Sequence, residues 1–328
     1  MTSFVHLRRS LVPALLILGA ILGAALLIGV SVGSASLSWS EIAREESIAR
    51  TILLRIRVPR VLAGALVGAI LAVAGLTFQT LLRNPLADPF ILGVSGGAAA
   101  GAAVATTLGW ARVPGLVQMV AFAGACAATA AVFFLARRRD HTDPTRLLLA
   151  GLVLNAFFSA VILIAFSFSR QSDLTGALRW MMGTLFGATW TEVVLLALFL
   201  LAAMLVLAWM ANDLRMLAFG EEDAKSRGVD VERVKLVGFV SGSLITGAAV
   251  SVSGIVGFVG LLVPHLVRLI WRRDFRFLLP LTALGGATLL VAADVVARMA
   301  VPATELPLAA LTALLGVPLF LSLLRRGV

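Results

Sequence analysis

The residues most able to do chemistry in this chain are the charged residues of one stretch, and the chemistry they indicate is recognition of a partner. Eleven charged residues of both signs fall within Asn212–Lys235, although only 13% of the chain is charged. Acidic residues follow Gly220 and basic residues precede Gly228, an order that matches the helix macrodipole and a glycine C-cap. Asp230 is placed to cap a second short helix through Arg233. We predict two short helices that dock on a soluble partner; a solvated linker is the alternative, although a linker needs no capped structure.

The phosphate-loop motif of ATP-binding proteins and the zinc motif of metalloproteases do not occur in the sequence. Neither of the two lysines, Lys225 and Lys235, follows a glycine, so there is no GK[ST] phosphate loop, and any ATP must be bound by another subunit. HExxH is also missing, and His6, His141 and His265 are too scattered to indicate a metal site. A packing role is favoured for His265 over a haem or iron ligand. We expect a non-enzymatic chain with no cofactor and no metal of its own.

Composition predicts a polytopic membrane protein. Hydrophobic residues make up 60% of the 328 residues and mean hydropathy is +1.03, which leaves too little polar surface for a soluble domain of this length. A formal charge of +10 would suggest nucleic acid in a soluble protein. Here most basic residues sit at the ends of apolar runs, a pattern of membrane topology and lipid headgroup contact, so we expect membrane lipid and no nucleic acid as partner. Cys126 is the only cysteine and is interpreted as a packing residue.

The apolar runs divide into ten predicted transmembrane helices. Leu236–Ile270 would be about 52 Å long as a single helix, too long for a hydrocarbon core of about 30 Å. Small residues around Gly254 therefore predict a hairpin of two short spans there. The spans are Leu11–Val30, Arg55–Gly75, a Gly/Ala-rich helix from Gly93, Gly115–Ala136, Leu147–Phe168, Thr191–Ala211, the two within Leu236–Ile270, Leu278–Ala297 and Leu306–Leu324.

Two further segments are predicted to lie at the membrane surface. Glu41–Arg50 is expected to form a short surface helix, and Arg170–Thr189 an amphipathic helix at the interface. The first apolar run is interpreted as a retained span. A signal peptide cleaved near Ala24–Ala25 is the alternative.

Positive charge orients the ten spans. With both termini inside, the inner segments carry 18 Lys and Arg residues and the outer segments nine. The positive-inside rule requires this sign, so both ends and the charged stretch 212–235 are predicted to be cytoplasmic. Five of the nine outer bases lie between Arg44 and Arg60 and need a separate explanation.

Long motifs give the chain a family resemblance. The string RIRVPRVLAGALVGAILAVAGLTFQTLLRNPLADPFILGVSGGAAAG near the N-terminal side, and SVSGIVGFVGLLVPHLVRLI and ADVVAR…ELPLAALTALLGVPLF further on, resemble the two halves of FecCD-type permeases. These are membrane subunits of type II ABC importers for ferric siderophores, haem and cobalamin. The resemblance implies a single all-α transmembrane domain over 1–328 with ten transmembrane helices per subunit and cytoplasmic coupling helices at about 212–235. It also implies a bacterial cytoplasmic (inner) membrane location.

The resemblance also implies the partners and assigns site residues. It implies a homodimer, two cytoplasmic ATP-binding subunits that carry ATP and Mg, and a periplasmic or lipid-anchored substrate-binding protein. Arg57, Arg60 and Arg298 match positions that receive glutamates of the binding protein; anchoring of lipid headgroups is the alternative. The residues that match the ATPase-coupling helices are Gly220, Glu221, Glu222, Ala224, Arg227 and Gly228. Those that match cytoplasmic gates are Asn84, Leu86, Pro144 and Thr145, for which simple turn formation is the alternative.

Function is weighed between three classes. An ion-coupled secondary transporter usually has an ionisable residue in mid-span, whereas Asp294 lies close to a predicted span end. No catalytic constellation supports a membrane enzyme, so an ATP-driven importer is favoured. For its substrate, ferric siderophore ranks first, cobalamin second and haem third; WMMG at Trp180–Gly183 resembles cobalamin permeases but also occurs in related forms in siderophore permeases.

Overall fold

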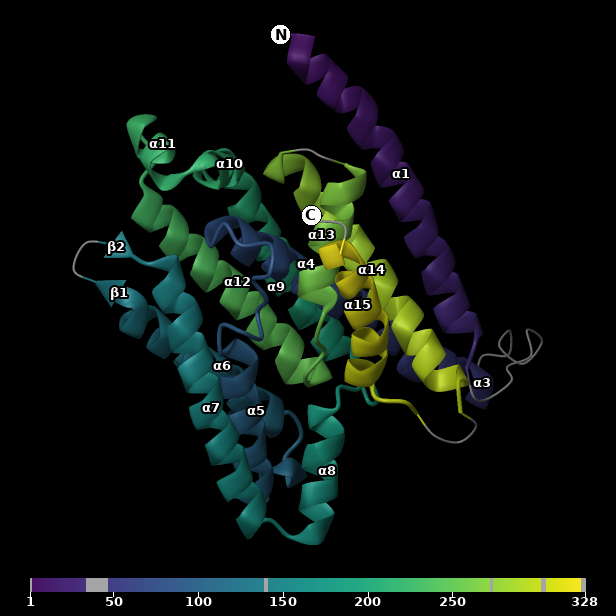
Figure 1. Cartoon of the computed structure of the whole chain (residues 1–328). Helices are drawn as coiled ribbons and strands as arrows, with labels where there is room; N and C mark the ends of the chain where they lie inside the picture. Colours follow the sequence, from purple (N-terminus) through teal and green to yellow (C-terminus); the bar gives the residue numbers. More distant parts are fainter. Residues whose placement is uncertain (1, 34–46, 139–140, 272–273, 302–304, 326–328) are drawn as a thin grey trace.

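The apolar runs fold as helices, since in lipid a helix satisfies its backbone hydrogen bonds within one segment. The computed structural model describes residues 2–33, 47–138, 141–271, 274–301 and 305–325 (Figure 1). Its elements are, in order, α1 (Thr2–Ser31), α3 (Ile48–Ile52), the π-helical η1 (Leu53–Arg57), α4 (Val58–Leu81), α5 (Val94–Thr107), the 3-10 helix η2 (Trp110–Arg112), α6 (Leu116–Ala136), β1 (Arg137–Arg138), β2 (His141–Thr142), α7 (Pro144–Phe168), α8 (Gln171–Met181), α9 (Trp190–Trp209), α10 (Ala211–Phe219), α11 (Glu221–Ser226), α12 (Val231–Ser253), α13 (Val259–Ile270), α14 (Phe275–Met299) and α15 (Leu308–Arg325).

Ten helices of the described residues account for the ten predicted spans. Seven are long and apolar enough to cross a membrane: α1, the continuous run of α3, η1 and α4, and α6, α7, α9, α12 and α14. The other three, α5, α13 and α15, are shorter. Most predicted boundaries agree with the observed ones to within a few residues, as for Gly115–Ala136, which is α6.

The second span begins earlier than we predicted. Residues Ile48–Leu81 form one helical run of 34 residues, so the end of the predicted surface helix Glu41–Arg50 belongs to this span. The start of that predicted helix lies outside the described residues. Ser47 caps the run, because its Oγ accepts a hydrogen bond from the Arg50 N–H at 3.1 Å. The π-helical turn in η1 lets the chain pass RIRVPR without a break.

The predicted hairpin within 236–270 is confirmed. Helix α12 ends at Ser253 and α13 begins at Val259. Gly254 between them has φ +67 and lies against the Trp180 carbonyl, where a side chain would not fit. The predicted amphipathic helix is shorter than expected: α8 ends at Met181, because Gly183 (φ +75) and Gly187 (φ +81) break it before α9.

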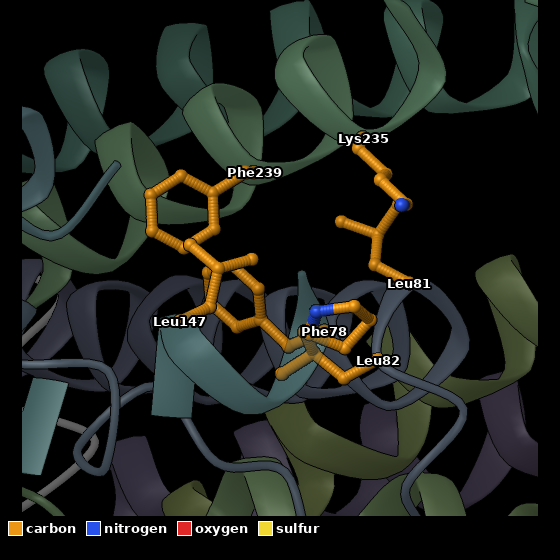
Figure 2. Close-up of a pocket in the computed structure, with 7 residues that line it drawn as sticks. Phe78, Leu81, Leu82, Leu147, Lys235 and Phe239 are labelled. Carbon is orange, nitrogen blue, oxygen red and sulfur yellow. The ribbon is translucent and has the colours of Figure 1, made fainter. Parts of the chain in front are cut away.

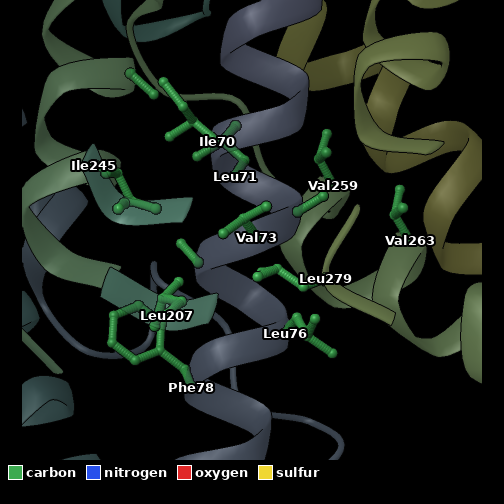
Figure 3. Packing of buried hydrophobic residues seen from close by; sticks show 14 of the residues in the cluster. Ile70, Leu71, Val73, Leu76, Phe78, Leu207, Ile245, Val259, Val263 and Leu279 are labelled. Carbon is green, nitrogen blue, oxygen red and sulfur yellow. The ribbon is translucent and has the colours of Figure 1, made fainter. Parts of the chain in front are cut away.

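Helix α4 forms the centre of the bundle. The most apolar part of the helical run that contains α4 is 83% buried, against 6% for α1 and 11% for α7. Figure 3 shows its side chains from Ile70 to Phe78 surrounded by residues of other helices, among them Leu207 of α9 and Ile245 of α12. Glycines allow the backbones to approach closely, since Gly75 of α4 lies against Gly260 of α13.

The charged stretch differs in part from its prediction. Its first predicted short helix is present as α11, and the predicted cap by Asp230 is confirmed, since Oδ1 accepts from the Arg233 N–H at 3.1 Å. The second helix is not short, however, because its first turn is the beginning of the long span α12. Helix α10 was not predicted. The ladder of β1 with β2 was also unexpected; it pairs Arg137 with Thr142 in antiparallel register.

Candidate functional site

Helices α10 and α11 form a projection at one end of the bundle, beside β1 and β2 (Figure 1). Gly220, with φ 147, turns the chain between them. The first turn of α11 is acidic, and Gly228 (φ +81) ends it by donating its N–H to the Lys225 carbonyl at 2.9 Å. Ala224 is buried and anchors α11, whereas the side chains of Glu222 and Arg227 face solvent. The six residues predicted to couple to an ATPase therefore lie together on one short element.

A buried lysine, which sequence reasoning missed, joins this projection to the body of the molecule. Lys235 is 3% exposed, and its Nζ donates to Glu221 Oε2 of α11 at 2.8 Å. The same Nζ donates to the Thr142 carbonyl of β2 at 2.7 Å and to Glu232 Oε1 at 3.3 Å. Glu232 Oε2 closes the network by accepting from the Thr142 N–H at 2.8 Å. We call these four residues the lysine node.

The lysine node lies next to one of the two predicted gates. Thr142 stands two residues before Pro144, the first residue of α7, and Asp143 caps that helix by accepting from the Thr145 N–H at 2.8 Å. Figure 2 shows the contact below the node, where residues of α4 and α12 meet the start of α7 around a cavity of about 10 Å³, too small for more than one water. The sequence signal for the node was the scarcity of lysine and the position of Lys235 at the start of an apolar run.

The second predicted gate lies beside the first, at the C-terminal end of α4. Asn84 is half-buried and its Oδ1 accepts from the N–H of the exposed Leu86 at 2.9 Å. Leu82 and Pro144 line the same small cavity, so the two gate segments adjoin each other. Asp88 follows in the same loop; burial raises the pKa of its carboxyl to about 6, although Oδ1 accepts from the Phe90 N–H at 2.8 Å.

The three arginines predicted to dock a binding protein lie together at the opposite end, but they are turned inward. Arg60 is 7% exposed and its guanidinium is shared by two carboxylates. Nε and Nη2 donate to Asp294 Oδ1 at 3.0 and 2.9 Å, and Nη1 and Nη2 donate to Glu305 Oε1 and Oε2 at 2.6 and 3.0 Å. Asp294 is almost fully buried, whereas the Glu305 side chain is 41% exposed.

Arg57 and Arg298 bind the C-terminal end of α1. Arg57 Nη1 donates to the Ser31 carbonyl at 3.0 Å, and Arg298 donates to the carbonyls of Gly29 and Val32, each at 3.0 Å. Cations at a helix C-terminus are favoured by its free carbonyls and its dipole. Arg298 Nε also forms an ion pair with Asp294 Oδ2 at 3.0 Å. Sequence analysis missed the acidic partners, and the docking role of the three arginines stays a prediction.

Known proteins are similar to this chain over almost its whole length. The model of the FecCD transport family matches residues 17–326. A cobalamin import system permease protein of Halobacterium salinarum is 46% identical over 277 residues, or 84% of this chain and 74% of that protein. A hemin transport system permease protein of Yersinia pestis is 41% identical over 84% of this chain and 83% of its own length. An uncharacterised ABC transporter permease protein of Bacillus subtilis is 37% identical over 98% and 96%.

A solved structure has the same fold. It is described as an inward-facing conformation of a metal-chelate type ABC transporter, and the two chains superpose with a TM-score of 0.84 at 31% sequence identity. The superposition covers 95% of this chain and 98% of that one.

Proposed function

This chain belongs to the FecCD transport family of ABC importer permeases, and from that premise we propose that it carries a large metal chelate across the bacterial cytoplasmic membrane. The observation that carries the proposal is the extent of the match, residues 17–326, which includes every predicted gate, docking and coupling residue. An ion-coupled transporter is not favoured, because Asp294 is held by Arg60 and Arg298 at the end of its span.

Cobalamin is the substrate we place first. Relatives at 46% and 41% identity are named for cobalamin or vitamin B12 import, and one at 41% for hemin. These names reverse the order that the sequence alone favoured, in which ferric siderophore preceded cobalamin. All three substrates are large metal chelates, so the transport class is the same for each.

ATP-driven movement enters the permease through α11. Two cytoplasmic ATPase subunits that bind ATP and Mg are proposed to hold α10 and α11, which places the projection and both termini in the cytoplasm. A displacement of α11 would pull on Lys235 through Glu221, and Lys235 would transmit it to Thr142, just ahead of the gate residues Pro144 and Thr145. Short charge-assisted hydrogen bonds suit this role because they keep their partners at a fixed distance.

At the opposite end, a glutamate of the binding protein is proposed to replace a carboxylate that already binds Arg60. Arg60 already binds two acidic side chains, so an incoming glutamate must replace one of them. Glu305 is the replaceable partner, since its side chain is 41% exposed, while Asp294 is 2% exposed. Arg57 and Arg298 would then orient the site by holding α1. A second copy of the chain completes the pathway, as the family resemblance implies.

Growth of cells that lack this gene tests the substrate. Cobalamin, ferric siderophores and haem are supplied one at a time as the limiting source. We expect growth to depend on the gene with cobalamin alone. Dependence on a different compound would replace cobalamin, and dependence on none would contradict the chelate class.

Replacement of Glu221–Arg227 by a flexible Gly/Ser segment tests the coupling step. Uptake should be lost while the permease still reaches the membrane in normal amount. A matched control replaces residues 109–115, a turn at the other end of the bundle, with a Gly/Ser segment of equal length. If uptake survives the first change, α11 is only a linker.

A further inference from the structure

A cavity lined by arginines lies at the same end of the bundle as α10, outside the lysine node. Its volume is about 350 Å³, and it is bordered by the end of α4, by α10, by α13 and by the start of α14. The polar side chains in its wall are Gln79, Thr80, Arg83, Arg215, Arg268 and Asp274. Its α10 wall belongs to the predicted coupling stretch 212–235, but none of the site residues predicted from sequence lines it. We call it the arginine cavity.

The wall of the arginine cavity carries an excess of positive charge. Three guanidinium groups face one carboxylate, which gives the wall a net charge of +2. Arg215 Nη1 donates to Asp274 Oδ2 at 3.2 Å and Nη2 donates to Asn212 Oδ1 at 3.1 Å. Two nitrogens of this wall, Nε of Arg215 and Nη2 of Arg268, are buried and have no hydrogen-bond partner within the described part of the chain. A buried donor without a partner is costly, so the wall is built to accept an anion.

The backbone conformation of Arg83 is a second indication that this cavity has a function. It occupies the left-handed position (φ +48) that ends α4, where its own N–H bonds to the Thr80 carbonyl and the Asn84 N–H bonds to the Gln79 carbonyl. This hydrogen-bond pattern is the one in which glycine is usual, because a side chain raises the energy of that conformation. A strained arginine that faces a cavity is an indication of function carried by its side chain.

We propose that the arginine cavity binds a phosphate-bearing anion, either a lipid headgroup or a free phosphate compound. Guanidinium groups match phosphate oxygens with paired hydrogen bonds, and the three of this wall come from α10, from α13 and from the turn that ends α4. A single carboxylate would leave most of the volume and one or more of the guanidinium groups unused. The cavity opens where apolar helices end, a place at which basic pockets between helices bind anionic headgroups. Asp274 limits the affinity by holding Arg215.

The test uses the purified full-length chain in an uncharged detergent, without any ATPase. Inorganic pyrophosphate, phosphatidylglycerol and the zwitterionic phosphatidylcholine are titrated separately, and binding is followed by calorimetry and by the rise in melting temperature. Saturable binding of pyrophosphate identifies a free phosphate compound as the source, and binding of phosphatidylglycerol alone identifies a lipid headgroup. Saturable binding of neither overturns the proposal and leaves the cavity to an acidic side chain of a protein partner.

Three variants tie binding to this cavity. Arg268→Gln should weaken binding about tenfold, the loss of one charge-assisted contact. Asp274→Asn should tighten it, roughly threefold, because Arg215 is released and a negative charge is removed. Arg83→Gly should weaken binding without lowering the melting temperature, since glycine relieves the backbone strain.

Arg137→Gln is the matched control, an exposed arginine at the same end but outside the cavity. Its affinity should equal that of the wild type. If Arg268→Gln fails to fold, the opposite shifts of Asp274→Asn and Arg83→Gly still decide. Wild-type affinity in both of these variants would overturn the proposal.

Discussion

The two ends of this molecule use arginine in opposite ways. At the end formed by the start of α4 and the end of α14, Arg60 and Arg298 both form ion pairs with Asp294, and Arg60 also binds Glu305. We call this the closed end. At the end that carries α10 and α11, Arg215 and Arg268 border a cavity of about 350 Å³ and keep buried donors without partners. Arginine content is therefore a poor guide to binding. The number and burial of nearby carboxylates decide which end is internally satisfied.

The largest expected effect is at the closed end. Asp294→Ala should destabilise the protein by about 3–5 kcal/mol, because it leaves two buried arginines without their shared partner. The melting temperature in detergent should fall on the order of 10 °C. Glu222→Gln, an exposed carboxylate with only a loose ion pair at 4.0 Å, is the control and should melt like the wild type. A wild-type melting temperature for Asp294→Ala would show that the arginines do not depend on it.

Lys235→Met should cost about 1–3 kcal/mol, since Glu221 and Glu232 lose a charged partner but keep some access to water. Its distinctive result is in hydrogen exchange. Exchange should rise together in α11 and in residues 141–145, which the lysine node joins. Lys225→Met, which changes an exposed lysine of α11 outside the lysine node, should change neither segment. A rise confined to α11 would contradict the transmission from Glu221 to Thr142.

Asp88 contrasts with Asp294, because it is buried without an arginine. Burial raises the pKa of the Asp88 carboxyl to about 6 from the ordinary value of 3.8. Below about pH 4 the carboxyl is protonated in the folded and in the unfolded protein, and its contribution to the free energy of unfolding is at its highest. This contribution is lost as pH rises through 6, because the unfolded protein releases the proton more readily than the folded one. Between pH 5 and pH 7.5 the loss should be about 1–1.5 kcal/mol. Asp88→Asn should remove this part of the pH dependence of the melting temperature. An unchanged pH profile in the variant would show that Asp88 is not buried in its charged state.

The smallest effect is expected for the half-exposed carboxylate of the closed end. Glu305→Gln should lower stability by less than about 1 kcal/mol, as for exposed ion pairs. It should nevertheless increase the amount of binding protein that copurifies with the permease, because Arg60 becomes easier to engage. Reduced copurification would mean that Glu305 forms part of the docking surface and is not displaced from it.

Features set by local sequence were predicted well. The apolar runs gave the ten helices, because burial of apolar side chains in lipid needs only length and composition. The break at Gly254 and the capped helix α11 also follow from local rules. The start of the second span was missed, since the charged residues near Arg50 concealed a helix that continues through a π-turn to Leu81.

The partners of the candidate site residues depend on contacts between distant segments. Arg60 is separated from Asp294 by 234 residues, and Lys235 from Thr142 by 93. The predicted topology and the family resemblance placed Arg57, Arg60 and Arg298 on one side of the membrane, but neither could show that carboxylates and α1 carbonyls already hold them. Nor could periodicity reveal the arginine cavity, whose wall combines four helices.

The side of the membrane on which α11 lies is the measurement that tests the central claim most directly. Cys126 is the only cysteine, so Cys126→Ser provides a background in which Glu222→Cys on α11 and Arg112→Cys on η2 are each the single thiol. We expect a membrane-impermeant maleimide to label position 112 in intact cells and position 222 only in inside-out vesicles, and position 222 to cross-link to an ATP-binding subunit. Labelling of position 222 from outside intact cells would contradict the proposed coupling of α11 to a cytoplasmic ATPase.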